Sequence, residues 1–252
     1  MELAAWEVVV LILAGLAGGF INVMAGGGSV ITVPVMIFLG VPGPIANGTN
    51  RLPILAHNIS AAVTYLRHGL PQWSMILSLS LCAIPGAVAG ALIGVRIPAD
   101  AFNLILAGVM GVVLLLMLSG AGDSQASEAS AISGRRRLIG HVLMVAAGFW
   151  GGFIQIGMGF ILLPILHRVL GLDLVAANIH KVFIILVYTV SALLVFGSQL
   201  QLLWWIGAIM AIGNTVGGWL GARLTLRGGE AIIRRVVIFA IAGMIVKLIW
   251  FP

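Results

Sequence analysis

The chain alternates between long apolar runs and short polar or Gly/Pro-containing breaks. The runs lie at about residues 3–23, 29–40, 47–66, 73–94, 101–119, 138–155, 159–170, 176–196, 200–221 and 231–250. Most of them reach the roughly 20 residues with which an α-helix crosses the hydrocarbon core of a bilayer. The opening residues, MELAAWE, lack the basic region of a cleavable signal peptide, so we expect the first run to remain as a span. The pattern predicts an all-α integral membrane protein.

Two of the runs, 29–40 and 159–170, are too short to cross a bilayer comfortably. Each follows a Gly-rich break, AGGGS at 25–29 and GMG at 157–159. Glycine adopts the backbone conformations of tight turns without steric cost. We therefore expect each short run to form half of a Gly-broken or re-entrant helical hairpin with the run that precedes it.

The composition excludes most functions of water-soluble proteins. Hydrophobic residues make up 61% of the chain and charged residues 8%, whereas about a quarter of the residues are charged in a soluble domain. The net charge is +6, but the basic residues lie in short loops between apolar runs, as expected of residues that orient a membrane protein. We therefore expect neither a soluble enzyme nor a nucleic-acid-binding protein.

The basic residues are distributed unequally between the two faces of a ten-segment topology. By the positive-inside rule, the richer face is cytoplasmic and both termini lie outside the inner (plasma) membrane, which the protein crosses several times. The poorer face has Arg51, Arg96 and Lys247. The richer face has nine arginines: Arg67, Arg135, Arg136, Arg137, Arg168, Arg223, Arg227, Arg234 and Arg235.

An internal repeat divides the chain into two halves. The sequence GGFINVMAGGGSVITVP at 18–34 resembles GGFIQIGMGFILLP at 151–164, and a constant offset of 131 aligns ANGTNR at 46–51 with ANIHK and the residue after it at 177–182. We assign 1–119 to the first membrane repeat, 120–137 to a cytoplasmic linker and 138–252 to the second repeat. An odd number of segments in each half makes the repeats inverted, an architecture typical of secondary transporters.

The charged groups inside the runs indicate an anionic cargo. All seven acidic residues lie at termini or in loops, whereas Arg51 and Lys181 lie within apolar runs. Small anions bind to backbone N–H groups at helix starts, to hydroxyls and to fixed cations. The residues that we expect to bind the substrate are Asn22, Gly26, Gly27, Gly28, Ser29, Asn47, Thr49, Asn50, Arg51, Gln155, Asn178, His180 and Lys181.

Each candidate also has a purely structural alternative. The two cations could snorkel to an interface, the glycines could serve close helix packing, and the amides could bond neighbouring helices. His57 and His180 could carry a coupling proton or make ordinary structural hydrogen bonds. Cys82 is the only cysteine and no catalytic or metal-binding motif is present in the sequence, so we expect no enzyme activity, no cofactor and no metal.

The succession GGFINVMAGGGSVITVPVMIFLGVPGPIANGTN at 18–50, with its shortened second copy at 151–181, resembles the sulfite exporter TauE/SafE family. The resemblance covers essentially the whole chain. It implies a transporter that exports sulfite, sulfonates, sulfoacetate or related anions, coupled to the proton gradient. The expected partners are a small anionic substrate and the lipid bilayer. An importer, a channel of the same fold and a membrane scaffold remain alternatives, and dimerisation remains open.

Overall fold

A computed structural model describes the backbone of residues 3–68, 73–118 and 133–250. Within these residues every regular element is helical, which confirms the predicted all-α class. Residues 119–132, which hold most of the expected linker, lie outside this range, as do the side chains of Arg234, Arg235 and Lys247. The elements are α1 (Ala5–Met24), α2 (Ser29–Phe38), α3 (Gly43–Thr49), α4 (Arg51–Leu66), α5 (Trp73–Gly94), α6 (Ala99–Leu118), α7 (Gly134–Phe153), α8 (Met158–Pro164), η1 (Ile165–Val169), α9 (Leu174–Gln199) and α10 (Trp204–Trp250).

Helix length and hydropathy match a membrane environment. Among the described residues, α1, α5 and α9 are long and apolar enough to cross a bilayer, and Ser29–Phe38, Ala99–Val112 and Met158–Val169 form shorter apolar stretches. Large apolar side chains such as Leu104 and Leu194 are exposed by 76% and 69%. Such surfaces are unfavourable in water but suit contact with lipid. The protein is therefore a helical membrane protein.

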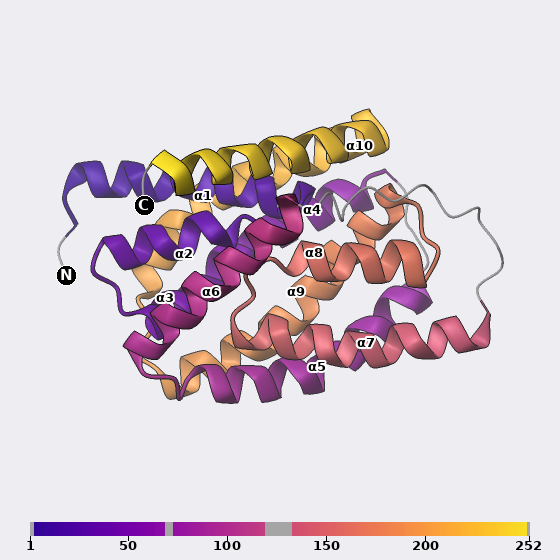
Figure 1. The fold of residues 1–252 in the computed structure, drawn as a ribbon, viewed down its shortest axis with the longest axis horizontal. Coiled ribbons are helices and arrows are strands. Elements are labelled where there is room, and N and C mark those ends of the chain that lie inside the picture. The colour runs from indigo at the N-terminus through magenta and orange to yellow at the C-terminus, as the bar shows by residue number, and fades with distance from the viewer. Residues whose placement is uncertain (1–2, 69–72, 119–132, 251–252) are drawn as a thin grey trace.

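The two short runs form short helices after Gly-rich breaks, as the sequence predicts. In the first break Gly26 has a φ of +80°, and in the second Gln155 and Gly157 have φ values of 60° and 74°. These left-handed conformations turn the chain, so that α2 lies beside α1 and the α8–η1 segment lies beside α7 (Figure 1). Each half therefore begins with a long helix and a shorter one joined by a tight turn.

Three predicted boundaries differ from the structure. The run at 47–66 is divided into α3 and α4, which meet at Asn50. The runs at 200–221 and 231–250 both lie within the residues assigned to α10. The first turn of α7 contains Arg135, Arg136 and Arg137, which we assigned to the linker; Ser133 caps this turn by accepting a hydrogen bond from the Arg136 N–H.

Small residues allow α1 and α10 to pack in direct backbone contact. A Cβ atom added at Gly15 or Gly19 of α1 would lie 2.3 or 2.5 Å from a carbonyl oxygen of α10. Likewise, a Cβ at Gly213 or Gly217 of α10 would lie 2.0 or 2.2 Å from a carbonyl oxygen of α1. Residue numbers rise together along the contact, so this part of α10 runs parallel to α1. Close approach through small residues is the usual means by which helices associate in membranes.

The same arrangement joins α5 and α7. A Cβ at Gly86 or Gly90 of α5 would lie 2.0 Å from a carbonyl oxygen of α7, and one at Gly148 or Gly152 of α7 would lie 2.0 Å from a carbonyl oxygen of α5. These helices also run parallel. The first helix of each sequence repeat thus packs against a helix of the other repeat, while α4 and α9 contact each other between the two pairs.

Candidate functional site

The two Gly-rich breaks touch each other through their backbones. The Gly159 N–H donates a hydrogen bond to the Gly26 carbonyl at 3.2 Å. A Cβ at Gly26 would lie 2.1 Å from the Gly159 Cα, and one at Gly159 would lie 2.0 Å from the Ala25 carbonyl oxygen. No side chain fits at either position without displacing backbone. The contact between the breaks therefore requires close packing at Gly26, which is also one of the predicted substrate-binding residues.

Arg51 belongs to the first repeat but is bound by the second. Its side chain is fully buried, and its guanidinium donates to the carbonyls of Gly151 and Gly152, at 2.8 Å for Gly152, and to the side-chain oxygen of Gln155. These acceptors lie at the end of α7 and in the break after it. A helix ends in unpaired carbonyls that carry partial negative charge, so a cation is stabilised there. The Phe196 ring lies 5.1 Å from the guanidinium carbon, where it adds a cation–π contact.

Lys181 shows the reverse relation. It belongs to the second repeat, is fully buried, and donates to the carbonyls of Asn22 and Val23 at 3.1 and 2.8 Å. Both carbonyls lie in the last turn of α1, directly before the first break. In this conformation the side chains of Arg51 and Lys181 are buried inside the protein and do not reach its surface. Each cation instead binds the helix end of the opposite repeat.

The start of α2 carries the remaining donors of the first break. The Gly28 N–H donates to the Asn22 side chain at 2.9 Å, and the Asn50 amide donates to the buried Ser29 hydroxyl at 3.4 Å. Within the described part of the chain, the N–H groups of Gly27 and Ser29 make no hydrogen bond. The first N–H groups of a helix lack partners within it and carry partial positive charge. The start of α2 therefore offers unpaired donors within the protein interior.

The two asparagines that the repeat aligns have different partners. The Asn47 amide donates to the Phe153 carbonyl at 2.8 Å, so Asn47 and Arg51 both bind the end of α7. The Asn178 amide donates to the hydroxyls of Tyr65 and Thr225, at 3.2 and 3.1 Å. The sequence predicts equivalent amides, but of the two only Asn47 bonds a helix-end carbonyl, while Asn178 bonds two hydroxyls.

Three other predicted residues make structural hydrogen bonds. The Thr49 hydroxyl accepts from the Leu203 N–H at 3.1 Å, which ties α3 to the start of α10. Both ring nitrogens of His57 are engaged, with the side chains of Asn214 at 2.9 Å and Asn58 at 3.0 Å. His180 uses one ring nitrogen to bond the Ala176 carbonyl at 2.8 Å. Its other nitrogen is buried.

Several buried polar atoms have no partner among the described residues. An unpaired buried polar group is costly, so such atoms mark places where a ligand or water would be stabilised. Four of these atoms belong to predicted site residues. The full set is Thr32 Oγ1, Asn50 Oδ1, Arg51 Nε, Ser80 Oγ, Asn178 Oδ1, His180 Nε2 and Tyr188 OH.

The structure adds residues that the sequence analysis missed. Tyr188 lies against Gly151, where a Cβ would be 2.8 Å from its hydroxyl, and the Thr189 hydroxyl accepts from the Gln155 amide at 3.4 Å. Extending the repeat offset of 131 from His57 and Asn58 leads to these two positions, so the signal was available. Tyr65 and Thr225 give no comparable sequence signal, because they are recognised only by their contact with Asn178.

The charge around the crossing is positive. The buried polar residues that the structure describes include one arginine and one lysine but no aspartate or glutamate. They also contain no group of three or more metal-ligand side chains. Opposite charge stabilises an ion in a poorly solvated interior, so the arrangement favours an anion over a cation.

Comparison with known proteins identifies the family. The family model described as "Sulfite exporter TauE/SafE" matches residues 11–248. The chain is 27% identical to a "Probable membrane transporter protein ORF9" of Sinorhizobium sp, covering 100% of this chain and 95% of the relative. It is 28% identical to the "Probable membrane transporter protein YfcA" of Escherichia coli K12, covering 96% and 89%. No solved structure matches it. This chain is therefore a membrane transporter that belongs to the sulfite exporter TauE/SafE family.

Proposed function

We propose that this transporter exports a small sulfur-containing oxyanion of the sulfite, sulfonate or sulfoacetate type across the inner membrane. The observation that carries the proposal is the convergence of two buried cations and unpaired N–H groups at the crossing of the Gly-rich breaks, with no acidic side chain buried among the described residues. A sulfur oxyanion presents several acceptor oxygens and negative charge, which such donors match. The arginine-rich face is cytoplasmic in this proposal.

In the proposed transport cycle, the two repeats of the chain are inverted relative to each other. In Figure 1, α1 runs from left to right whereas α7 runs from right to left, as inversion requires. Two further features support the same symmetry. Each repeat packs a helix against the other repeat, in the pairs α1–α10 and α5–α7, and each repeat supplies a cation, Arg51 or Lys181, that caps a helix end of the other. Rocking one set of helices against the other would expose the breaks to one side at a time, which is alternating access.

Substrate binding could drive the cycle by competing for the two cations that cap the helix ends. Arg51 and Lys181 bind helix-end carbonyls in this conformation. An anion bound at the start of α2 brings a full negative charge that competes with those partial charges for the two cations. Loosening of either cap frees the break that follows it. Asn50 would assist through its amide, because its side-chain bond to Ser29 is long at 3.4 Å.

A proton-coupled cycle needs a group that can gain a proton without breaking the fold. His180 fits better than His57, because its buried Nε2 has no partner among the described residues while its Nδ1 is held by the Ala176 carbonyl. Protonation of His57 would require the Asn58 amide, which lies 3.0 Å from its Nε2, to rotate. We therefore assign the coupling proton to His180.

Counterflow of labelled sulfite in proteoliposomes tests the proposal. Arg51→Gln and Lys181→Gln should abolish counterflow, whereas Arg96→Gln should match the wild type because Arg96 is exposed. Asn50→Ala should keep the wild-type apparent melting temperature but raise the half-saturating sulfite concentration about tenfold or more, as expected for the loss of a hydrogen bond to a charged ligand. This variant remains informative if Arg51→Gln does not fold.

Three outcomes would overturn the proposal. Wild-type counterflow in both cation variants would remove Arg51 and Lys181 from the pathway. Steady ionic current without counterflow would instead assign the protein as a channel. Unchanged half-saturation in folded Asn50→Ala would move the binding site away from the start of α2.

A further inference from the structure

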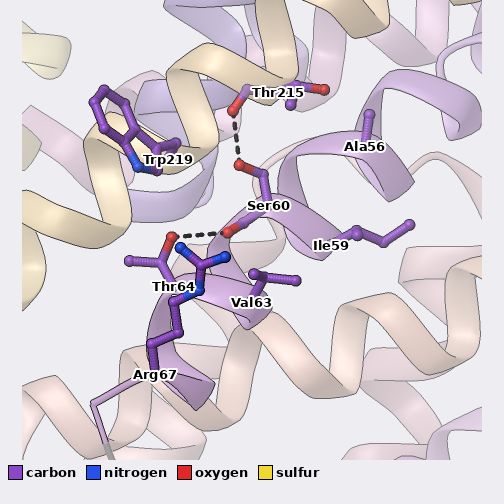
Figure 2. Close-up of a pocket in the computed structure, with 8 residues that line it drawn as sticks. All are labelled: Ala56, Ile59, Ser60, Val63, Thr64, Arg67, Thr215 and Trp219. Atoms are coloured by element: carbon purple, nitrogen blue, oxygen red, sulfur yellow. Dashed lines mark hydrogen bonds between the residues drawn. The ribbon is translucent and has the colours of Figure 1, made fainter.

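A groove lies on the outer surface between α4 and α10, and none of its lining residues belongs to the crossing breaks. It has a volume of about 370 Å³. In Figure 2 the side chains that line it come from α4, from Arg67 directly after α4, and from α10. The lining residues are Ala56, Ile59, Ser60, Val63, Thr64, Arg67, Thr215 and Trp219.

The hydroxyl groups of the groove are already bonded within the protein. Ser60 donates to the Thr215 carbonyl at 2.9 Å, Thr64 donates to the Ser60 carbonyl at 2.9 Å, and Thr215 donates to the Ala211 carbonyl at 2.8 Å. Ile59 is 51% exposed beside them. The walls therefore present mainly methyl and methylene groups, so an apolar ligand can bind without displacing hydrogen bonds.

Positive charge gathers at the groove. The Arg67 guanidinium turns back over it toward Thr64 in Figure 2, and no interaction joins it to another described residue. On the opposite wall the Arg223 guanidinium carbon lies 4.1 Å from the centre of the Trp219 ring, which holds that arginine beside the groove. None of the lining residues is acidic.

We propose that this groove binds an anionic phospholipid, with an acyl chain along its apolar wall and the headgroup phosphate at Arg67 and Arg223. Phosphate pairs well with guanidinium groups, and a tryptophan beside basic residues is typical of the membrane–water boundary. Basic grooves between spans on the cytoplasmic side bind anionic headgroups in the same way. The walls come from different sequence repeats, so the bound lipid would bridge both halves.

Native mass spectrometry of the purified protein with equal amounts of phosphatidylglycerol and phosphatidylethanolamine, matched in their acyl chains, tests this proposal. The wild type should retain phosphatidylglycerol preferentially. Arg67→Gln and Arg223→Gln should each lower its retention about fivefold. Arg135→Gln, which changes an exposed arginine at the start of α7, should leave it unchanged. Val63→Trp, which fills the apolar wall and keeps both arginines, should also reduce retention.

Several results would overturn the proposal. Equal retention of the two lipids would exclude recognition of the headgroup charge. Equal loss in Arg67→Gln and Arg135→Gln would show a general charge effect. Displacement of the lipid by millimolar inorganic phosphate would show that the headgroup alone is bound. Folding of each variant is checked by its apparent melting temperature, and unchanged retention in folded Val63→Trp would exclude the groove as the acyl-chain site.

Discussion

Replacing Gly26 by alanine probes the contact between the two breaks. The new Cβ would lie 2.1 Å from the Gly159 Cα, and the residue would keep a φ of +80°. A left-handed conformation costs a non-glycine residue about 1–2 kcal/mol, and forcing an extra methyl group into a packed interior costs about 1–3 kcal/mol. We therefore expect Gly26→Ala to lower the free energy of unfolding by about 2–5 kcal/mol.

Alanine substitutions at three other glycines separate the cost of the left-handed conformation from the cost of the steric contact. Gly40 has a φ of +85° with no atom within 4 Å of the added Cβ, so Gly40→Ala should show the conformational cost alone. Gly159→Ala should show the contact alone, because its Cβ would lie 2.0 Å from the Ala25 carbonyl oxygen. At Gly108 in α6 the added Cβ meets no atom within 4 Å, so alanine should stabilise the helix by about 0.5–1 kcal/mol.

The apparent melting temperature of each purified variant in detergent measures the effect. About 2–4 °C is expected for each kcal/mol in a chain of this size. The apparent melting temperature should be highest for Gly108→Ala, lower for Gly40→Ala and lowest for Gly26→Ala. Equal losses for Gly26→Ala and Gly40→Ala, or a neutral Gly159→Ala, would refute the contact between the breaks.

Two further predictions concern buried polar groups. Tyr188→Phe removes a hydroxyl that has no partner among the described residues and should leave the free energy of unfolding unchanged or raise it, whereas Tyr65→Phe removes the acceptor of an Asn178 hydrogen bond and should lower it by about 1–3 kcal/mol. Thermal unfolding compares them, and equal losses would contradict the assigned partners. His180→Gln should retain sulfite counterflow but lose net flux driven by an imposed pH gradient. Persistent pH-driven flux in proteoliposomes would exclude His180 as the proton carrier.

Much of the architecture could be predicted from the order of the residues alone. Hydropathy and run length predict membrane helices because the bilayer imposes a minimum apolar length on every span. The two short helices after Gly26 and Gly157 were predicted for the same reason, since a run too short to span must turn within the protein. Sequence comparison between the halves also placed Arg51 and Lys181 at related positions, inside runs that lack acidic residues.

Only the tertiary structure decides which groups meet. Arg51 binds the end of α7, 100 and 101 positions away in the chain, and Lys181 binds the end of α1. The parallel packing of α1 with α10 and of α5 with α7 brings these helix ends to the partner repeat. Hydropathy cannot reveal this exchange, because it records how apolar a segment is and not which segment covers it. The contact between Gly26 and Gly159 depends on the same packing, since two backbones approach so closely only where neither carries a side chain.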